Sequence, residues 1–192
     1  MRTGPVTKNA STVALGLAQI RVGVSATNIA SIDPVLTSAD SIGVLVNTKF
    51  VGKTDWYKLE SGFPALEDFT TAIRESAALD CAFKEITPYN MALAYGKDPA
   101  ALTQAHSGEI ALGGRVAPEF VRMEAVYTYP NGSNTMTIIF PRAQVSASMD
   151  IDLKVSDAAA SPITFEAKRA DSETVGGNAV WDNKPLGRIV WG

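Results

Sequence analysis

The sequence predicts a mainly β fold in a single domain, and three observations predict it. Apolar and polar residues alternate with a period of two along several segments, which is typical of strands with one buried face. Turn-forming residues separate these segments, since the chain has 15 glycines and 10 prolines. The length of 192 residues suffices for one core but is short for two independent domains.

The longest predicted strand runs from Phe69 to Phe83. Charged residues such as Arg74 and Asp80 take one parity, and apolar residues take the other. Its length of about fifteen residues exceeds the usual five or six, which favours a barrel wall or a sheet shared between subunits. The apolar parity consists of Phe69, Ile73, Ala77, Leu79, Cys81 and Phe83.

Shorter segments show the same alternation, and a turn joins two of them. Pro130-Asn131-Gly132-Ser133 supplies turn residues, so the strands on either side should pair as an antiparallel hairpin. Pro141 predicts a bend or an edge in the second strand. The remaining predicted strands cover residues 15–24, 42–50, 121–129, 149–155, 163–167 and 188–191.

One short helix is predicted between Thr87 and Gly96. Thr87 can cap its first turn, Pro88 suits the first helical position, and Gly96 can end it. Tyr89 and Leu93 lie among its apolar residues.

Charge and cysteine content narrow the function classes. The formal charge of -3 argues against a protein that grips nucleic acid, because phosphate binding needs clustered cations. Cys81 is the only cysteine, which excludes an intramolecular disulfide and fits a reducing cytoplasm. On an apolar strand face its thiol should be inert. Neither a secretion signal nor an apolar run long enough to span a bilayer is visible, so we expect a soluble, unprocessed chain.

No set of residues predicts catalysis, a metal site or a cofactor. His106 is the only histidine and lies in a polar stretch typical of a surface loop. Asp150 and Asp152 superficially resemble an acid-base couple, but strand alternation alone places two carboxylates on one solvated face. The glycine-rich residues 108–114 fit no phosphate-binding or dinucleotide motif. We therefore expect a protein that is not an enzyme.

Residues 53–60 combine adjacent aromatic side chains with charges of both signs. Two interpretations remain open. The segment either fills the domain's own core or forms an exposed contact patch, for which tryptophan and tyrosine are enriched.

Two longer stretches carry a resemblance to a known family. IGVLVNTKF, followed by TDWYKLESGFPALEDFTTAIRESAALDCAFKEITPYNMALAYG, resembles the major tail tube proteins of tailed bacteriophages. VYTYPNGSNTMTIIFPRAQVSASMDIDLKVSDAAASPITFEAKRADS is similar to the hairpin and closing strand of that family. Together the two stretches cover more than half of the chain.

The resemblance implies a β-sandwich or partly closed barrel with one flanking short helix. It further implies hexameric rings in which a continuous barrel is completed across the subunits and lines a channel. Stacked rings would form the tail tube of the virion, assembled in the bacterial cytoplasm. Implied partners are copies of this chain, tape-measure, tail-terminator and baseplate or tip proteins, and the sheath of a contractile tail. DNA would pass without specific binding, and no membrane is involved.

The resemblance also assigns roles to particular residues. A stacking loop at residues 52–68 would contact the next ring, whereas an N-terminal arm at 1–12 and a C-terminal segment at 180–192 would pack on neighbouring subunits. Trp181 and Trp191 are the candidates for that subunit packing. Polar parity makes Asp80, Asp150 and Asp152 candidates to face the lumen, although Arg74 and Lys84 share the face of Asp80. The inter-ring candidates are Lys53, Asp55, Trp56, Tyr57 and Glu60.

Two alternatives remain open. A β-sandwich module that binds carbohydrate or mediates adhesion would use Trp56, Tyr57 and Trp181 as a stacking platform and would be a monomer. The inner-tube protein of a related contractile injection device would share both the fold and the assembly.

Overall fold

The structure is a computed structural model that describes residues 14, 16, 18–97, 107–114, 117–146, 150–151, 153 and 158–192. Within this part of the chain it is mainly β, as predicted, with seven strands in one antiparallel sheet that does not close. The strands are β1 (Gln19–Val24), β2 (Leu45–Ser61), β3 (Leu66–Phe83), β4 (Val121–Thr128), β5 (Thr135–Val145), β6 (Ser161–Ala167) and β7 (Arg188–Trp191). The helical segments are α1 (Ser25–Asn28), η2 (Ser38–Asp40), α2 (Pro88–Ala94) and η3 (Ala179–Trp181).

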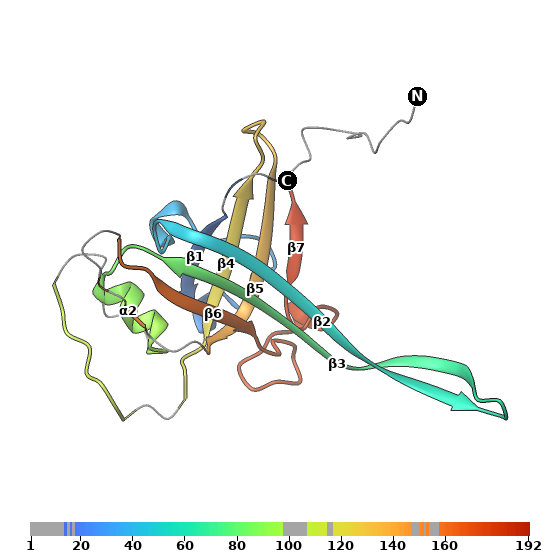
Figure 1. The fold of residues 1–192 in the computed structure, drawn as a ribbon. Helices are drawn as coiled ribbons and strands as arrows, with labels where there is room; N and C mark the ends of the chain where they lie inside the picture. The colour runs from blue at the N-terminus through green and yellow to red at the C-terminus, as the bar shows by residue number, and fades with distance from the viewer. Residues whose placement is uncertain are drawn as a thin grey trace.

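The sheet has the order β1-β4-β5-β6-β3-β2, with β7 beside β5. One edge of β5 is shared between two strands, because β7 pairs with Met136–Ile139 and β6 pairs with Ala143–Val145. In Figure 1, β6, β3 and β2 cross in front of β4 and β5. The sheet therefore folds over on itself, and residues from both of its halves belong to one main core cluster.

The predicted hairpin is confirmed, since β4 and β5 pair antiparallel. In its turn the side-chain oxygen of Asn131 accepts hydrogen bonds from the backbone of Ser133 and Asn134, both at 3.1 Å, and Gly132 supplies a φ of +73°. The predicted irregularity at Pro141 is confirmed too. The β4–β5 register shifts beside it, and the β7 and β6 pairings with β5 end on either side of it.

The helix α2 forms where the sequence predicts it. The Thr87 hydroxyl accepts a hydrogen bond of 3.2 Å from the Asn90 backbone, and Pro88 begins the helix. Gly96 follows with a φ of +71°, a conformation that a residue with a Cβ rarely adopts. The side chain of Leu93 joins the main core, so α2 closes one end of the folded sheet.

The predicted strand at 149–155 is not found at the three residues of this segment that the structure describes. Asp150, Ile151 and Leu153 lie outside every strand, and the other residues of that segment fall outside the described residues. Alternation alone does not make a strand, because a strand also needs a neighbour with which its backbone can pair. In the described residues, the chain between β5 and β6 has no such partner at these three positions.

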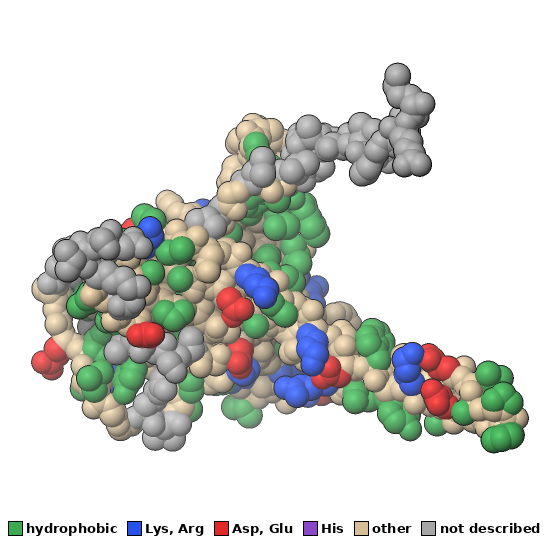
Figure 2. All heavy atoms as spheres, in the orientation of Figure 1, with side chains coloured by type: hydrophobic (Ala, Val, Ile, Leu, Met, Phe, Trp, Pro, Cys, Tyr) green, Lys and Arg blue, Asp and Glu red, His purple; other side chains and the backbone are tan. Residues whose placement is uncertain are grey.

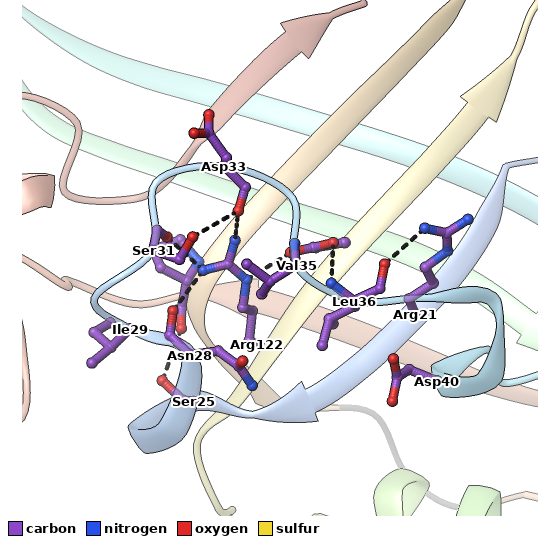
Figure 3. Close-up of polar contacts among 12 residues, drawn as sticks. Arg21, Ser25, Asn28, Ile29, Ser31, Asp33, Val35, Leu36, Asp40 and Arg122 are labelled. Carbon is purple, nitrogen blue, oxygen red and sulfur yellow. Dashed lines mark hydrogen bonds and ion pairs between the residues drawn. The ribbon is translucent and has the colours of Figure 1, made fainter.

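A polar cluster is buried on the other face of β4, opposite the main core. The Arg122 and Glu124 side chains form an ion pair at 2.7 Å, and both are completely buried. Arg122 donates to the carbonyls of Asn28, Ser31 and Asp33 at 2.7–2.8 Å. Glu124 accepts from the backbone N–H groups of residues 35 and 36 at 3.0 and 3.1 Å. The pair therefore ties the segment after α1 onto β4 (Figure 3).

Candidate interaction surface

The most exposed part of the described fold is a hairpin that projects from the body (Figure 1). Inside the body β3 lies between β2 and β6, but its pairing with β6 ends at Ala78. Beyond that point β2 and β3 continue as a two-stranded ribbon, closed by a turn at residues 62–65. We call residues 52–77 the arm. An isolated two-stranded ribbon is marginally stable in water, so the arm is a segment that gains from a partner.

The segment predicted as an inter-strand stacking loop at residues 52–68 is part of a hairpin of two long strands. Most of these residues lie within β2 and β3, and only the turn at 62–65 interrupts them. The sequence does not predict strands at these residues, because neither face of an exposed ribbon is buried and the apolar and polar residues therefore do not alternate.

A β-bulge divides the arm. Asp55 pairs with Arg74, but its neighbour Trp56 pairs with Ala72, which leaves Ile73 as the extra residue in β3. Paired residues share a sheet face, so the parity of β3 changes at Ile73, and a second extra residue, Asp68, changes it again near the end of the arm. The prediction of one continuous apolar parity from Phe69 to Phe83 is therefore wrong. Leu79, Cys81 and Phe83 point into the core, whereas Phe69 lies on the opposite face.

Beyond the bulge the two faces of the arm differ in chemistry. One face, the apolar arm face, is dominated by Tyr57, Leu59, Leu66 and Phe69, with Ser61 and Thr71 as its polar members. The other, the polar arm face, carries Trp56 together with Lys58, Glu60, Glu67 and Thr70. Lys58 and Glu67 form an ion pair at 2.7 Å across this polar face, and Thr70 donates to Glu67. Figure 2 shows hydrophobic side chains gathered toward the end of the arm.

All five inter-ring candidates lie on the arm, as part of β2. Trp56 is 59% exposed and Tyr57 is 52% exposed, so of the two open interpretations the structure favours the exposed patch over the core. Lys53 and Asp55 form an exposed ion pair at 2.9 Å, and the ammonium of Lys53 lowers the pKa of the Asp55 carboxyl. Glu60 lies on the polar arm face. Trp56 and Tyr57 point to opposite faces of the ribbon, so they do not form one stacking platform.

The three lumen candidates are not brought together. Asp80 lies on the solvent-facing side of β3, where it accepts a hydrogen bond of 2.8 Å from the Thr164 hydroxyl. In the strand register it stands opposite Lys49 of β2. Asp150 is exposed but belongs to no strand. Asp152 lies outside the described residues, as do His106 and the N-terminal arm at 1–12.

The two C-terminal tryptophans differ sharply. Trp181 is fully buried within its own subunit against Ile139 and Ala170, and its indole N–H donates to the Ile29 carbonyl at 2.7 Å. Its predicted role in subunit packing is wrong, because no part of the side chain reaches the surface. Trp191 remains a candidate for such packing, since it is 64% exposed at the end of β7. Nothing in the sequence distinguishes these two residues.

The described residues offer little catalytic chemistry. They contain no group of three or more histidine, cysteine, aspartate or glutamate side chains that could hold a metal ion. Burial, reinforced by the charge of Asp80, raises the pKa of the Cys81 thiol to about 12. None of the helices in this part of the chain is long and apolar enough to cross a membrane.

A groove of about 590 Å³ lies beside α1 and the start of β4. The polar groups along it serve the fold. Asp40 accepts from the Thr37 backbone at 2.7 Å, and the Arg142 guanidinium stacks on the ring of Phe120 at 3.7 Å. Tyr89 donates to the Val22 carbonyl at 3.1 Å. The arm is therefore the stronger candidate for a functional surface.

Comparison with known proteins identifies no relative. No protein-family model matches the chain, and no curated protein matches its sequence. The function must therefore be argued from the arm and from the sequence itself.

Proposed function

We propose that this chain is a structural subunit that assembles with copies of itself into a tube, as in the tails of the bacteriophages whose tail tube proteins it resembles. The observation that carries this proposal is the arm. It extends beyond the body, has no third strand to support it in the described residues, and presents an apolar face to solvent.

The amount of exposed apolar surface supports an interface. A large side chain that is fully open exposes about 200 Å², so the apolar side chains of the arm together expose on the order of 800 Å². That is about what one partner contributes to a standard protein interface. The side chains concerned are Trp56, Tyr57, Leu59, Phe63, Leu66, Phe69 and Ile73.

The edge of the sheet supports assembly as well. β2 is the last strand in the sheet order, and no described strand pairs with its outer edge. An exposed edge of this length invites pairing with another chain, and natural monomers usually protect such edges. In a tube, the edge of one subunit would find its partner in the next, and closure of the ring would remove it.

In this proposal six subunits form a ring, and the arms join stacked rings through residues 53–60 and the apolar arm face. The continuous barrel lines a channel through which DNA passes. The chain is a virion component without catalytic activity or cofactor, and its tube ends on tape-measure, terminator and tip proteins. The inner tube of a contractile injection device would use the same surfaces.

The test is assembly of the purified full chain, followed by gel filtration and negative-stain electron microscopy. The wild type should form rings or filaments. The double variant Leu59→Ser and Phe69→Ser should remain a folded subunit, because both side chains lie on the exposed apolar arm face. Trp56→Ala should weaken assembly in the same direction.

A matched control removes exposed apolar side chains elsewhere. Leu112→Ser and Val175→Ser lie off the arm and are at least as exposed, so this double variant should assemble normally. A wild type that stays monomeric at high concentration would contradict the proposal. Equal loss of assembly in both double variants would remove the arm from the interface.

A further inference from the structure

The solvent-facing side of β2, β3 and β6 has a charge that the composition of the chain does not reveal. We call this side the outer face. In β6, Ile163 and Phe165 point into the core, so Thr164 and Glu166 between them point outward. The register of β3 places Asp80 opposite Thr164 on this same face. Its charged residues are Lys49, Lys53, Asp55, Arg74, Asp80, Lys84, Glu166 and Lys168.

The outer face carries five cationic side chains and three carboxylates, although the whole chain has a formal charge of -3. Lys168 is paired with Glu166 at 2.6 Å. Lys53 is paired with Asp55, and Arg74 lies directly across from the same carboxylate.

Lys49 and Lys84 form no ion pair within the described residues. The nearest outer-face carboxylate, Asp80, lies opposite Lys49 and is hydrogen-bonded by Thr164. The chain's negative charge therefore lies elsewhere, including on the polar arm face.

The cations are also arranged in a row. Lys84 directly follows the end of β3, Lys49 and Lys53 come next along β2 toward Arg74, and ten residues of chain separate Lys84 from Arg74. At about 3.3 Å per residue this row extends roughly 33 Å, close to one turn of a DNA duplex. Figure 2 shows charged side chains strung along β2 and β3 from the body toward the arm.

We propose that the outer face is a weak, sequence-independent contact surface for the phosphates of DNA. The residues facing outward here are charged or small, without an aromatic ring between Lys49 and Asp55 on which a base could stack. Contacts would therefore be made to the backbone, which positions a duplex without reading its sequence. The inference extends the proposed function, in which Asp80 is a candidate to face the channel, but its test does not require assembly.

The experiment measures binding of the full chain to a short fluorescent duplex by anisotropy, between about 50 and 200 mM salt. The double variant Lys49→Gln and Lys84→Gln removes two outer-face cations that form no ion pair in the part of the chain that the structure describes. Its matched control, Lys97→Gln and Lys184→Gln, changes the net charge equally at sites away from the outer face. Each lost phosphate contact should lower the slope of log affinity against log salt by about 0.9, so we expect a decrease of roughly one to two in the first variant.

The control should keep the wild-type slope. The assembly-deficient arm variant should still bind, because the outer face belongs to a single subunit. Equal slopes in the two glutamine variants, or no binding by the wild type at the lowest salt, would overturn the inference. Failure of wild-type assembly with intact DNA binding would instead contradict only the proposed tube.

Discussion

Arg122 and Glu124 form the one ion pair in the described residues whose two side chains are both completely buried. Both lie on β4, both are buried, and between them they bond five backbone groups of the segment between α1 and η2. Taking two charges out of water is costly, and mutual attraction compensates only when every remaining hydrogen bond is made. Among the buried nitrogen and oxygen atoms of these two side chains, none lacks a hydrogen-bond partner, so neither residue can be exchanged singly without leaving a charge unpaired.

Arg122→Met should therefore lower the free energy of unfolding by about 3–5 kcal/mol, because it leaves the buried Glu124 carboxylate without its partner. Glu124→Gln keeps the shape of the side chain but leaves the buried Arg122 guanidinium without its carboxylate, so it should also cost about 3–5 kcal/mol. Urea denaturation followed by circular dichroism measures both. A loss below about 1 kcal/mol for Arg122→Met would mean that other contacts hold the segment.

The buried thiol of Cys81 should make the free energy of unfolding depend on pH. The folded thiol has its pKa raised to about 12, whereas an unfolded thiol titrates near 8.5. As pH rises above 8.5 the unfolded chain loses this proton and the folded chain keeps it, so stability falls with pH in that range. Between pH 8 and pH 10 the loss should be about 2 kcal/mol. Cys81→Ala should flatten this dependence in urea denaturation, and an unchanged slope would contradict the assignment.

Among the elements, the sequence predicted those whose signals are local. The β4–β5 hairpin and α2 depend on turn and cap residues that lie within a few positions of one another, and both form as predicted. The arm was predicted less well, because the bulge at Ile73 depends on how two strands pair and leaves no mark in either strand alone. The three described residues of the predicted strand at 149–155 lie outside every strand, for the related reason that alternation says nothing about a pairing partner.

The arm should be dispensable for folding. Its residues beyond Val51 and Ala78 contribute little to the main core, so replacing residues 54–75 by a two-residue Asn-Gly turn should leave the body intact. We expect a cooperative thermal transition within a few degrees of the wild type, measured by circular dichroism. A collapse of that transition would show that the arm supports the body and is not simply an interaction surface.

Across the whole molecule, alternation and turn residues predicted the fold class, but composition did not predict the distribution of charge. A net charge of -3 suggested a surface that repels phosphate, yet the outer face of the sheet carries more cations than carboxylates. Trp181 and Trp191 show the same limit, since one is buried and the other exposed although both lie in the same C-terminal segment. Which face or layer a residue joins depends on contacts between distant segments, and one sequence does not contain that information in readable form.

Beyond the bulge at Ile73 the apolar side chains lie on the solvent-facing side of the ribbon and the charged ones on its core side. This arrangement restricts which surfaces the end of the arm can contact. If the ribbon curled back toward its own core side, it would bring Lys58, Glu60 and Glu67 against apolar residues and would have to strip them of water. The end of the arm therefore has no favourable docking site on its own subunit, and its apolar face stays in contact with solvent. The apolar side of the arm thus remains free to bind a neighbouring subunit and does not fold back onto the body that carries it.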